Sequence, residues 1–166
     1  MKSFGRILTS WFSAAVIWKI EDGVLWIMVQ QLKSTHPLYA HNPAEVKMIG
    51  GTNTDHPEDG DPLATLRREL KDETADPDRP EETGLIMRPG FVPEVIYEPP
   101  ATSSGHQKFF YLVPWTELTG EIRTVPIKDG DDEVSVPRWE RADELHRVLY
   151  RTHQAALHWT VQRLIP

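Results

Sequence analysis

No cysteine occurs in the 166 residues of the chain. This absence excludes disulfide bonds, thiolate zinc sites and a cysteine nucleophile. It is typical of proteins in a reducing compartment, and we therefore expect a cytoplasmic protein. The chain also lacks any apolar run near the roughly 20 residues of a membrane-spanning helix, so we expect no membrane partner.

Positive charge is scarce, with 18 Lys and Arg against 25 Asp and Glu and a formal net charge of −7. Such a chain has no broad cationic surface for nucleic-acid phosphates, and we expect no nucleic-acid partner. An acidic protein that binds an anion needs a local device, and a metal ion is the obvious candidate. The length fits a single domain spanning residues 1–166.

Two basic residues precede an apolar stretch from residue 7 to residue 20, a pattern that loosely resembles a secretory signal. Polar residues interrupt this stretch at Ser10, Ser13 and Lys19, and it continues directly into a strand-like pattern. We therefore interpret it as the first strand of the domain.

The strongest local signal is a hairpin. Ala14–Glu21 and Val24–Gln31 are rich in Val, Ile and Trp, and Asp22-Gly23 lies between them. Asp-Gly between two such runs predicts a tight turn, because the turn needs positive φ angles that Gly accepts without strain. A short strand is expected over residues 45–49, ending in Gly50-Gly51.

A helix is predicted to begin at Asp61 and Pro62. Asp is a good N-cap, and Pro suits the first helical position because its missing N–H costs nothing there. Leu63, Leu66 and Leu70 then form one apolar stripe. The helix must end before Pro77.

The remaining elements complete a mixed pattern. We expect paired strands over residues 91–98 and 108–113, an acidic turn at 129–132, a last short strand at 134–139, and a helix over 142–165 with a break near Thr152. The order hairpin, strand, helix, strands, helix predicts an α/β (α+β) fold in which helices cover the faces of a mixed sheet.

Three acidic residues of the first helix lie close together. At 100° per residue, Glu69, Asp72 and Glu73 share one face about 100° wide. Carboxylates so close repel one another unless a cation lies among them. A solvated acidic helix face is the alternative explanation.

The sequence around these carboxylates resembles the signature of the Nudix hydrolase family. That signature has an opening Gly, an isolated Glu, Arg-Glu-aliphatic, Glu-Glu, and a closing Gly-aliphatic pair. Here the second half is filled in register by Arg68, Glu69, Leu70, Asp72 and Glu73, and Gly51 stands for the opening Gly. The resemblance implies an α/β/α sandwich with a mixed central sheet, and a hydrolase that cleaves a phosphoanhydride bond.

The resemblance also implies a cofactor, Mg²⁺ or Mn²⁺, and roles for individual residues. Glu69, Asp72 and Glu73 are the expected metal ligands, with Glu69 also a plausible base. Arg68 is expected to orient the carboxylates, so that Arg68, Glu69 and Glu73 form the catalytic set. Gly50 and Gly51 would contribute to the cofactor site by adopting positive φ beside the helix.

The chain departs from the family signature in three ways. Sixteen residues separate Gly51 from Arg68, three more than in the family, and no Glu occupies the isolated upstream position. Ala75 replaces the closing Gly. A second segment, Glu81-Glu82-Thr83-Gly84-Leu85, matches the closing half of the signature instead. Glu81 and Glu82 are therefore rival metal ligands to Asp72 and Glu73. We prefer Asp72 and Glu73, because Pro77 and Pro80 must break any helix that runs through to Glu81.

Two functions remain open on the sequence. The first is metal-dependent hydrolysis of a nucleoside diphosphate linked to another group, which includes nucleoside triphosphates, dinucleoside polyphosphates, ADP-ribose and nucleotide sugars. The second is a catalytically silent Nudix-like module that binds a nucleotide or a protein. The resemblance also implies a further acidic residue at the metal site, from a loop before the last strand, and Glu133 is the best match. A solvated acidic residue in a turn explains Glu133 equally well. A homodimer is compatible with the sequence, but no feature demands one.

Overall fold

The structure is a computed structural model that describes residues 9–165. Its elements, in chain order, are β1 (Ser10–Glu21), β2 (Val24–Ser34), β3 (Glu45–Lys47), β4 (Ile49–Thr52), α1 (Pro62–Thr74), β5 (Ile86–Met87), β6 (Glu94–Tyr97), β7 (His106–Pro114), the short 3₁₀ helix η1 (Trp115–Glu117), β8 (Leu118–Thr119), β9 (Ile127–Asp129), β10 (Asp132–Val134), β11 (Arg138–Arg141), α2 (Ala142–Leu145) and α3 (Arg151–Leu164).

The predicted hairpin is confirmed. Strands β1 and β2 pair antiparallel, and Asp22 and Gly23 form the turn with φ angles of 51° and 76°. Two successive residues with positive φ match the twist of the flanking strands. Strand β1 begins at Ser10, as expected for the apolar stretch, whereas residues 7 and 8 of that stretch lie outside the described residues.

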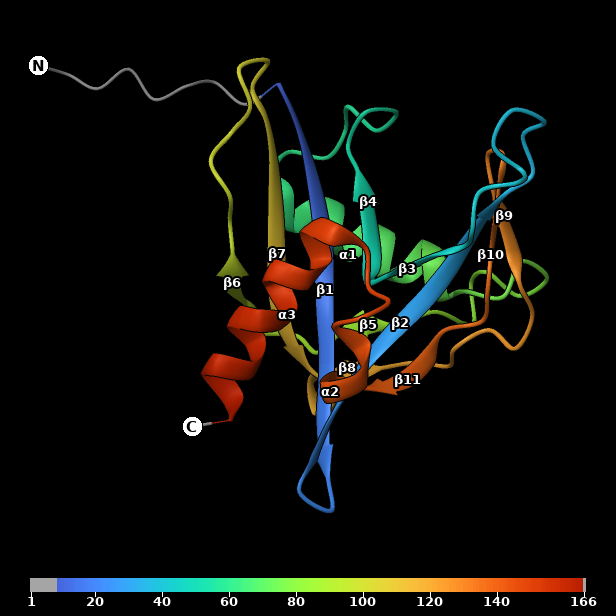
Figure 1. Ribbon diagram of the computed structural model, residues 1–166. Helices are drawn as coiled ribbons and strands as arrows, with labels where there is room; N and C mark the ends of the chain where they lie inside the picture. Colours follow the sequence, from blue (N-terminus) through green and yellow to red (C-terminus); the bar gives the residue numbers. More distant parts are fainter. Residues whose placement is uncertain (1–8, 166) are drawn as a thin grey trace, which may run out of the picture.

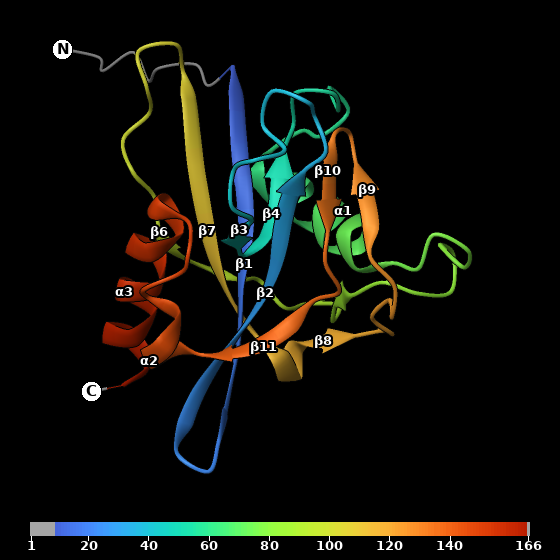
Figure 2. The same cartoon turned by 45° about the vertical axis from the view of Figure 1, so that its right-hand side comes forward.

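Strand β2 is the centre of a mixed sheet (Figures 1 and 2). One edge of β2 pairs with β1 and β3, and the other pairs with β11 and β10. Strand β1 runs parallel to β7, while the other pairings of the sheet within residues 9–165 are antiparallel. The parallel pairing makes the sheet mixed, as predicted.

Alternating residues of β1 and β2 face two separate apolar cores. Ala14 and Val16 pack with Leu145 and Leu157 of α2 and α3. Ala15, on the opposite face of β1, belongs to the core that contains the apolar stripe of α1. Side chains of a strand alternate between the two faces of a sheet, so β1 is covered on both sides. Figure 1 shows α2 and α3 on one face and α1 behind the sheet, which confirms the predicted α/β/α sandwich.

Helix α1 begins as its sequence predicts. The carboxylate of Asp61 accepts a hydrogen bond from the Ala64 N–H at 2.7 Å, and Pro62 occupies the first turn. The helix ends at Thr74, before Pro77. Within residues 9–165, none of the helices is both long and apolar enough to span a bilayer.

Three predicted element boundaries were wrong. The strand expected over residues 45–49 is divided between β3 and β4, and Gly50 and Gly51 lie within β4. The expected strand over residues 134–139 is divided, because β10 ends at Val134 and β11 begins at Arg138. The C-terminal helix breaks between Leu145 and Arg151, before the expected position near Thr152. The Tyr150 N–H donates to the Val46 carbonyl of β3 at 2.8 Å, so the chain leaves the helical conformation there to contact the sheet.

Candidate active site

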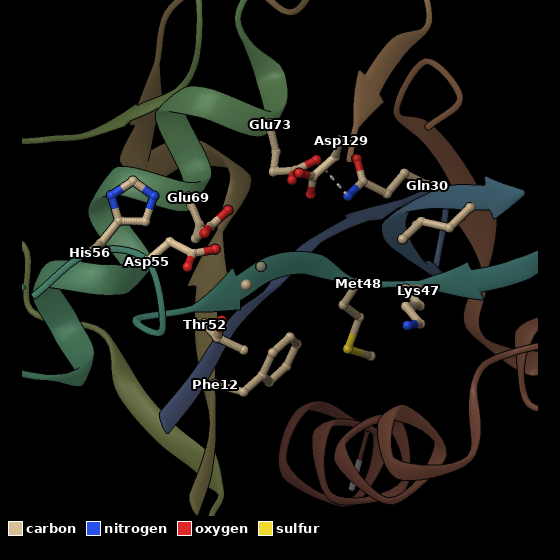
Figure 3. A pocket seen from close by; sticks show the side chains of 13 residues that line it. Phe12, Gln30, Lys47, Met48, Thr52, Asp55, His56, Glu69, Glu73 and Asp129 are labelled. Atoms are coloured by element: carbon tan, nitrogen blue, oxygen red, sulfur yellow. Dashed lines mark hydrogen bonds between the residues drawn. The ribbon is translucent and has the colours of Figure 1, made fainter. Parts of the chain in front are cut away.

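A cavity of about 420 Å³ lies between α1, the sheet and the β9–β10 hairpin. Glu69 and Glu73 of α1 both line it, because residues four apart lie on the same side of a helix. Figure 3 shows these two carboxylates on one side of the cavity and Lys47, Met48 and Phe12 on the other. The complete lining comprises Phe12, Gln30, Leu32, Lys47, Met48, Gly50, Gly51, Thr52, Asp55, His56, Glu69, Glu73 and Asp129.

Asp72 does not line this cavity. Its side chain is 60% exposed, compared with 13% for Glu69, and it lies 3.7 Å from the nearest guanidinium nitrogen of Arg68. Asp72 lines a different surface cavity, together with Asp76. The expectation that one helical face directs all three carboxylates to one point therefore does not hold for Asp72.

Arg68 connects the loop before α1 to Glu69. Its Nε and Nη2 donate to the carboxylate of Asp59 at 2.9 to 3.2 Å, and its Nη1 donates to Glu69 Oε1 at 2.9 Å. Asp59 is 8% exposed and also accepts from the Thr65 hydroxyl at 2.7 Å. The hydrogen bonds from Arg68 hold the pKa of Asp59 below its usual value. This arrangement fixes the guanidinium and, through it, one oxygen of Glu69.

Gly50 and Gly51 both line the cavity, but the positive φ angles predicted for them were wrong. Neither has a positive φ angle, and both belong to strand β4. They are instead required for close approach. A Cβ atom on Gly51 would lie 2.4 Å from the Glu69 carboxylate, and one on Gly50 would lie 2.2 Å from the backbone oxygen of Ser13. Gly51 thus leaves the space that the Glu69 carboxylate occupies against the strand.

Burial and nearby negative charges make Glu69 and Glu73 hard to ionise. Burial raises the pKa of Glu69, and the Arg68 guanidinium opposes this rise. Burial raises the pKa of Glu73 to about 7, and the negative charges of Glu69 and Asp129 add to the effect. Carboxylates in this situation gain stability from any cation that binds among them.

Gln30 supports Glu73 from strand β2. Its Nε2 donates to Glu73 Oε2 at 3.2 Å, and Figure 3 shows the side chains of Gln30, Glu73 and Asp129 pointing toward one another. Gln30 is 2% exposed, and its Oε1 accepts no hydrogen bond from the described residues. A buried carbonyl oxygen without a donor is costly, so this atom is suited to a donor that a ligand brings.

The residues of the cavity fit a divalent cation by their chemistry. Oxygen donors suit Mg²⁺, which binds through one or two carboxylates and keeps several waters for substrate phosphates. Glu69 and Glu73 supply the carboxylates, and Asp129 adds negative charge. Among residues 9–165, however, no group of three or more acidic or histidine side chains is already placed around one metal position. The site therefore offers paired carboxylates and not a complete protein cage.

The two halves of the irregular signature occupy different places. Glu81 and Glu82 are exposed in the loop after α1 and do not line the Glu69 cavity. Gly84 and Leu85, which follow these glutamates, lie beside the C-terminal end of α1. A Cβ on Gly84, whose φ is +97°, would lie 2.7 Å from the Lys71 carbonyl, and Leu85 is buried in the core under α1. The closing Gly-aliphatic pair is thus supplied by the second segment and the carboxylates of the cavity by the first.

Sequence reasoning missed three acidic residues of the site, namely Asp55 and Asp129, which line the cavity, and Asp59, which binds Arg68. Asp59, the partner of Arg68, lies in the lengthened loop before α1 and had no helical or strand pattern to mark it. Asp129 lines the cavity from the end of β9, whereas the candidate Glu133 is exposed and does not line it. The acidic turn was recognised in the sequence, but the hairpin geometry that selects Asp129 was not.

These features define a class of protein: an α/β/α sandwich with a carboxylate-lined cavity beside its mixed sheet.

No protein-family model and no curated protein matches the chain. Several solved structures, however, are similar to the chain in fold. The NUDIX domain of Shewanella oneidensis NrtR, complexed with ADP ribose, is 17% identical with a TM-score of 0.57 and covers 93% of this chain and 87% of its own. A MutT NUDIX hydrolase from Burkholderia pseudomallei is 18% identical with a TM-score of 0.52, covering 90% and 95%. A C. elegans Ap4A hydrolase is 12% identical with a TM-score of 0.50, covering 95% and 99%.

The chain has the Nudix fold. This finding confirms, at the level of the fold, the resemblance that the residues around Glu69 indicated.

Proposed function

We propose that the protein is a metal-dependent hydrolase that cleaves a phosphoanhydride bond in a nucleoside diphosphate linked to another group. The observation that carries this proposal is the shared placement of Glu69 and Glu73 in one cavity, with the pKa of Glu73 raised to about 7. Structural neighbours include a domain complexed with ADP ribose and an Ap4A hydrolase, which supports a nucleotide-type small-molecule substrate.

In this proposal Glu69 and Glu73 hold Mg²⁺ or Mn²⁺. The bound ion would screen phosphate charge, polarise the phosphoryl group and lower the pKa of a bound water. Arg68 keeps one Glu69 oxygen at 2.9 Å from its guanidinium, which orients the carboxylate toward the ion. The Oε1 of Gln30, which has no donor among the described residues, would accept a hydrogen bond from the substrate. Asp72 has no direct part, since it lies outside the cavity.

The second candidate function is a silent module that binds a nucleotide without cleaving it. The irregular signature favours this alternative, because the spacing before Arg68 is longer than in the family and Ala75 replaces the closing Gly. Against it, Arg68 and Asp59 maintain the orientation of Glu69, an arrangement that simple nucleotide binding does not require.

A panel of nucleotides assayed with Mg²⁺ separates the two. The panel contains a nucleoside triphosphate, a dinucleoside polyphosphate, ADP-ribose and a nucleotide sugar, and release of phosphate, pyrophosphate or nucleoside monophosphate is measured. The hydrolase predicts turnover of at least one substrate that Glu73→Gln reduces by about 100-fold or more. Saturable binding of a nucleotide with no turnover, equal in wild type and Glu73→Gln, would favour the silent module.

A further inference from the structure

Two lysines are neighbours around the ring of Tyr150, and one of them lines the end of the cavity opposite Glu69 and Glu73. Lys47, on β3, lines the cavity directly. Lys108, on β7, is the register partner of Phe12 on the neighbouring parallel strand, and Phe12 also lines the cavity. The two lysines come from strands that are distant in sequence, and the fold brings both amines to the ring of Tyr150.

Both amines lie around the ring of Tyr150, just before α3. The Lys47 Nζ is 4.4 Å from the ring centroid and the Lys108 Nζ is 5.9 Å from it. The Lys108 Nζ is also 5.8 Å from the centroid of Phe12 and donates to the Thr152 hydroxyl at 3.2 Å. Aromatic faces accept cations, but they do not neutralise the charge as a carboxylate does.

The positive charge here is incompletely compensated. Lys47 forms an ion pair with Glu45 at 3.1 Å, and Glu45 is half exposed. Lys108 has no such partner among the described residues, and its pKa is lowered by burial and by the charge of Lys47. His153, packed beneath against Phe12 and Tyr150, is buried and contributes no positive charge of its own near neutral pH. Two neighbouring amines with only one half-exposed carboxylate paired to them among the described residues favour an anion as a further partner.

We propose that Lys47 and Lys108 form a second anionic subsite that binds a phosphate of the substrate other than the two joined by the cleaved bond. This inference rests on the proposed hydrolase function and narrows its substrate class. ADP-ribose and nucleotide sugars carry two phosphates, which the carboxylate end of the cavity engages. A substrate that also reaches the lysines needs a longer phosphate chain, so the preferred substrates are nucleoside or dinucleoside polyphosphates with three or more phosphates.

Binding without metal tests the subsite independently of catalysis. Inorganic tripolyphosphate is titrated by calorimetry into protein kept in EDTA at low salt. The wild type is expected to bind saturably, and Lys108→Met and Lys47→Met are each expected to weaken binding about tenfold, since one charge-assisted contact is lost. Met keeps the aliphatic stem of each lysine, and Lys108→Arg, which keeps the charge, should bind within about threefold of wild type.

Lys19→Met is the matched control. The Lys19 Nζ also lies over an aromatic ring, 4.5 Å from the centroid of Trp139, and also pairs with a glutamate, but it is outside the cavity. The Lys19→Met variant should bind tripolyphosphate as the wild type does. No saturable binding by the wild type, or equal affinities for wild type and Lys108→Met, would overturn the subsite.

Substrate preference tests the narrower claim. With Mg²⁺, Lys108→Met should raise the KM for a nucleoside triphosphate about tenfold and leave the KM for ADP-ribose unchanged. An equal rise for both substrates would contradict the assignment to a third phosphate. If no nucleotide is hydrolysed, the proposed hydrolase fails, while the metal-free titration still decides whether the lysine subsite exists.

Discussion

The Arg68 guanidinium binds the Asp59 carboxylate through two nitrogens, at 2.9 to 3.2 Å. The same guanidinium donates to Glu69, so a residue of the loop controls the position of a cavity carboxylate. The family signature has a Glu upstream of its Arg, and this chain has none at that spacing. Asp59 is the acidic partner that Arg68 contacts instead.

Replacing Asp59 with Asn should impair catalysis more than substrate binding. Loss of the ion pair frees Arg68 and lets Glu69 reorient, so kcat should fall about 10- to 100-fold with a smaller change in KM. The free energy of unfolding should fall by about 2 kcal/mol, because a mostly buried guanidinium loses its partner. Steady-state kinetics and chemical denaturation measure both. Asp61→Asn is the control, because Asn also caps a helix well. Unchanged kcat in Asp59→Asn would show that Arg68 does not depend on Asp59.

The two adjacent glycines of β4 should respond differently to alanine. In Gly51→Ala the new methyl group meets only the carboxylate end of Glu69, which can rotate away. Activity should therefore fall about 100-fold while the free energy of unfolding changes by less than about 1 kcal/mol. In Gly50→Ala the methyl group meets the Ser13 backbone oxygen, so we expect destabilisation by about 3 kcal/mol or more. Equal effects of the two variants on stability would contradict this account.

The raised pKa of Glu73 predicts a pH-dependent cost in the metal-free protein. The unfolded side chain loses its proton near pH 4.5, whereas the folded one keeps it up to about pH 7. The stability of the wild type should therefore fall as the pH rises through this interval. Glu73→Gln removes the effect, so from pH 4 to pH 8 it should gain about 3 kcal/mol relative to wild type. Denaturation in EDTA across this range measures the gain. A constant difference between the two proteins would show that Glu73 ionises normally.

The buried His153 predicts a pH dependence of stability with the opposite sign. Burial first, and then the charges of Lys47 and Lys108, lower the pKa of His153 to about 3 from its usual value of 6.5. Between these values the unfolded state binds a proton that the folded state does not, so stability should fall as the pH drops, by up to about 1.4 kcal/mol per pH unit. His153→Gln can still accept from the Met48 N–H, and it should lose this slope. A slope that persists in the variant would assign it to another group.

The sequence was most informative where structure is determined locally. The cap of α1 needs only Asp61 and Pro62, and the Asp22-Gly23 turn needs only its own φ angles, so both could be predicted. The placement of Asp72 was also within reach. It lies about 160° around the helix from the buried Leu70, whereas Glu73 lies only about 60° from it. A narrower carboxylate face, aligned on the leucine stripe, would have excluded Asp72.

The rest of the site depends on contacts between distant segments. Asp59 reaches Arg68 only because the loop after β4 folds back over α1, and Asp129 enters the cavity only because β9 and β10 form a hairpin beside β2. The Gly51 requirement likewise arises from the packing of β4 against Glu69. No local periodicity encodes these distances, so composition and spacing alone could not have identified them.

Calorimetric titration of Mn²⁺ tests most directly whether Glu69 and Glu73 together hold a divalent cation. We expect the wild type to bind Mn²⁺ at a saturable site, Glu73→Gln to lose that binding, and Asp72→Asn, which alters a carboxylate outside the cavity, to retain it within about threefold. The absence of saturable binding in the wild type, or a loss in Asp72→Asn equal to that in Glu73→Gln, would contradict the account.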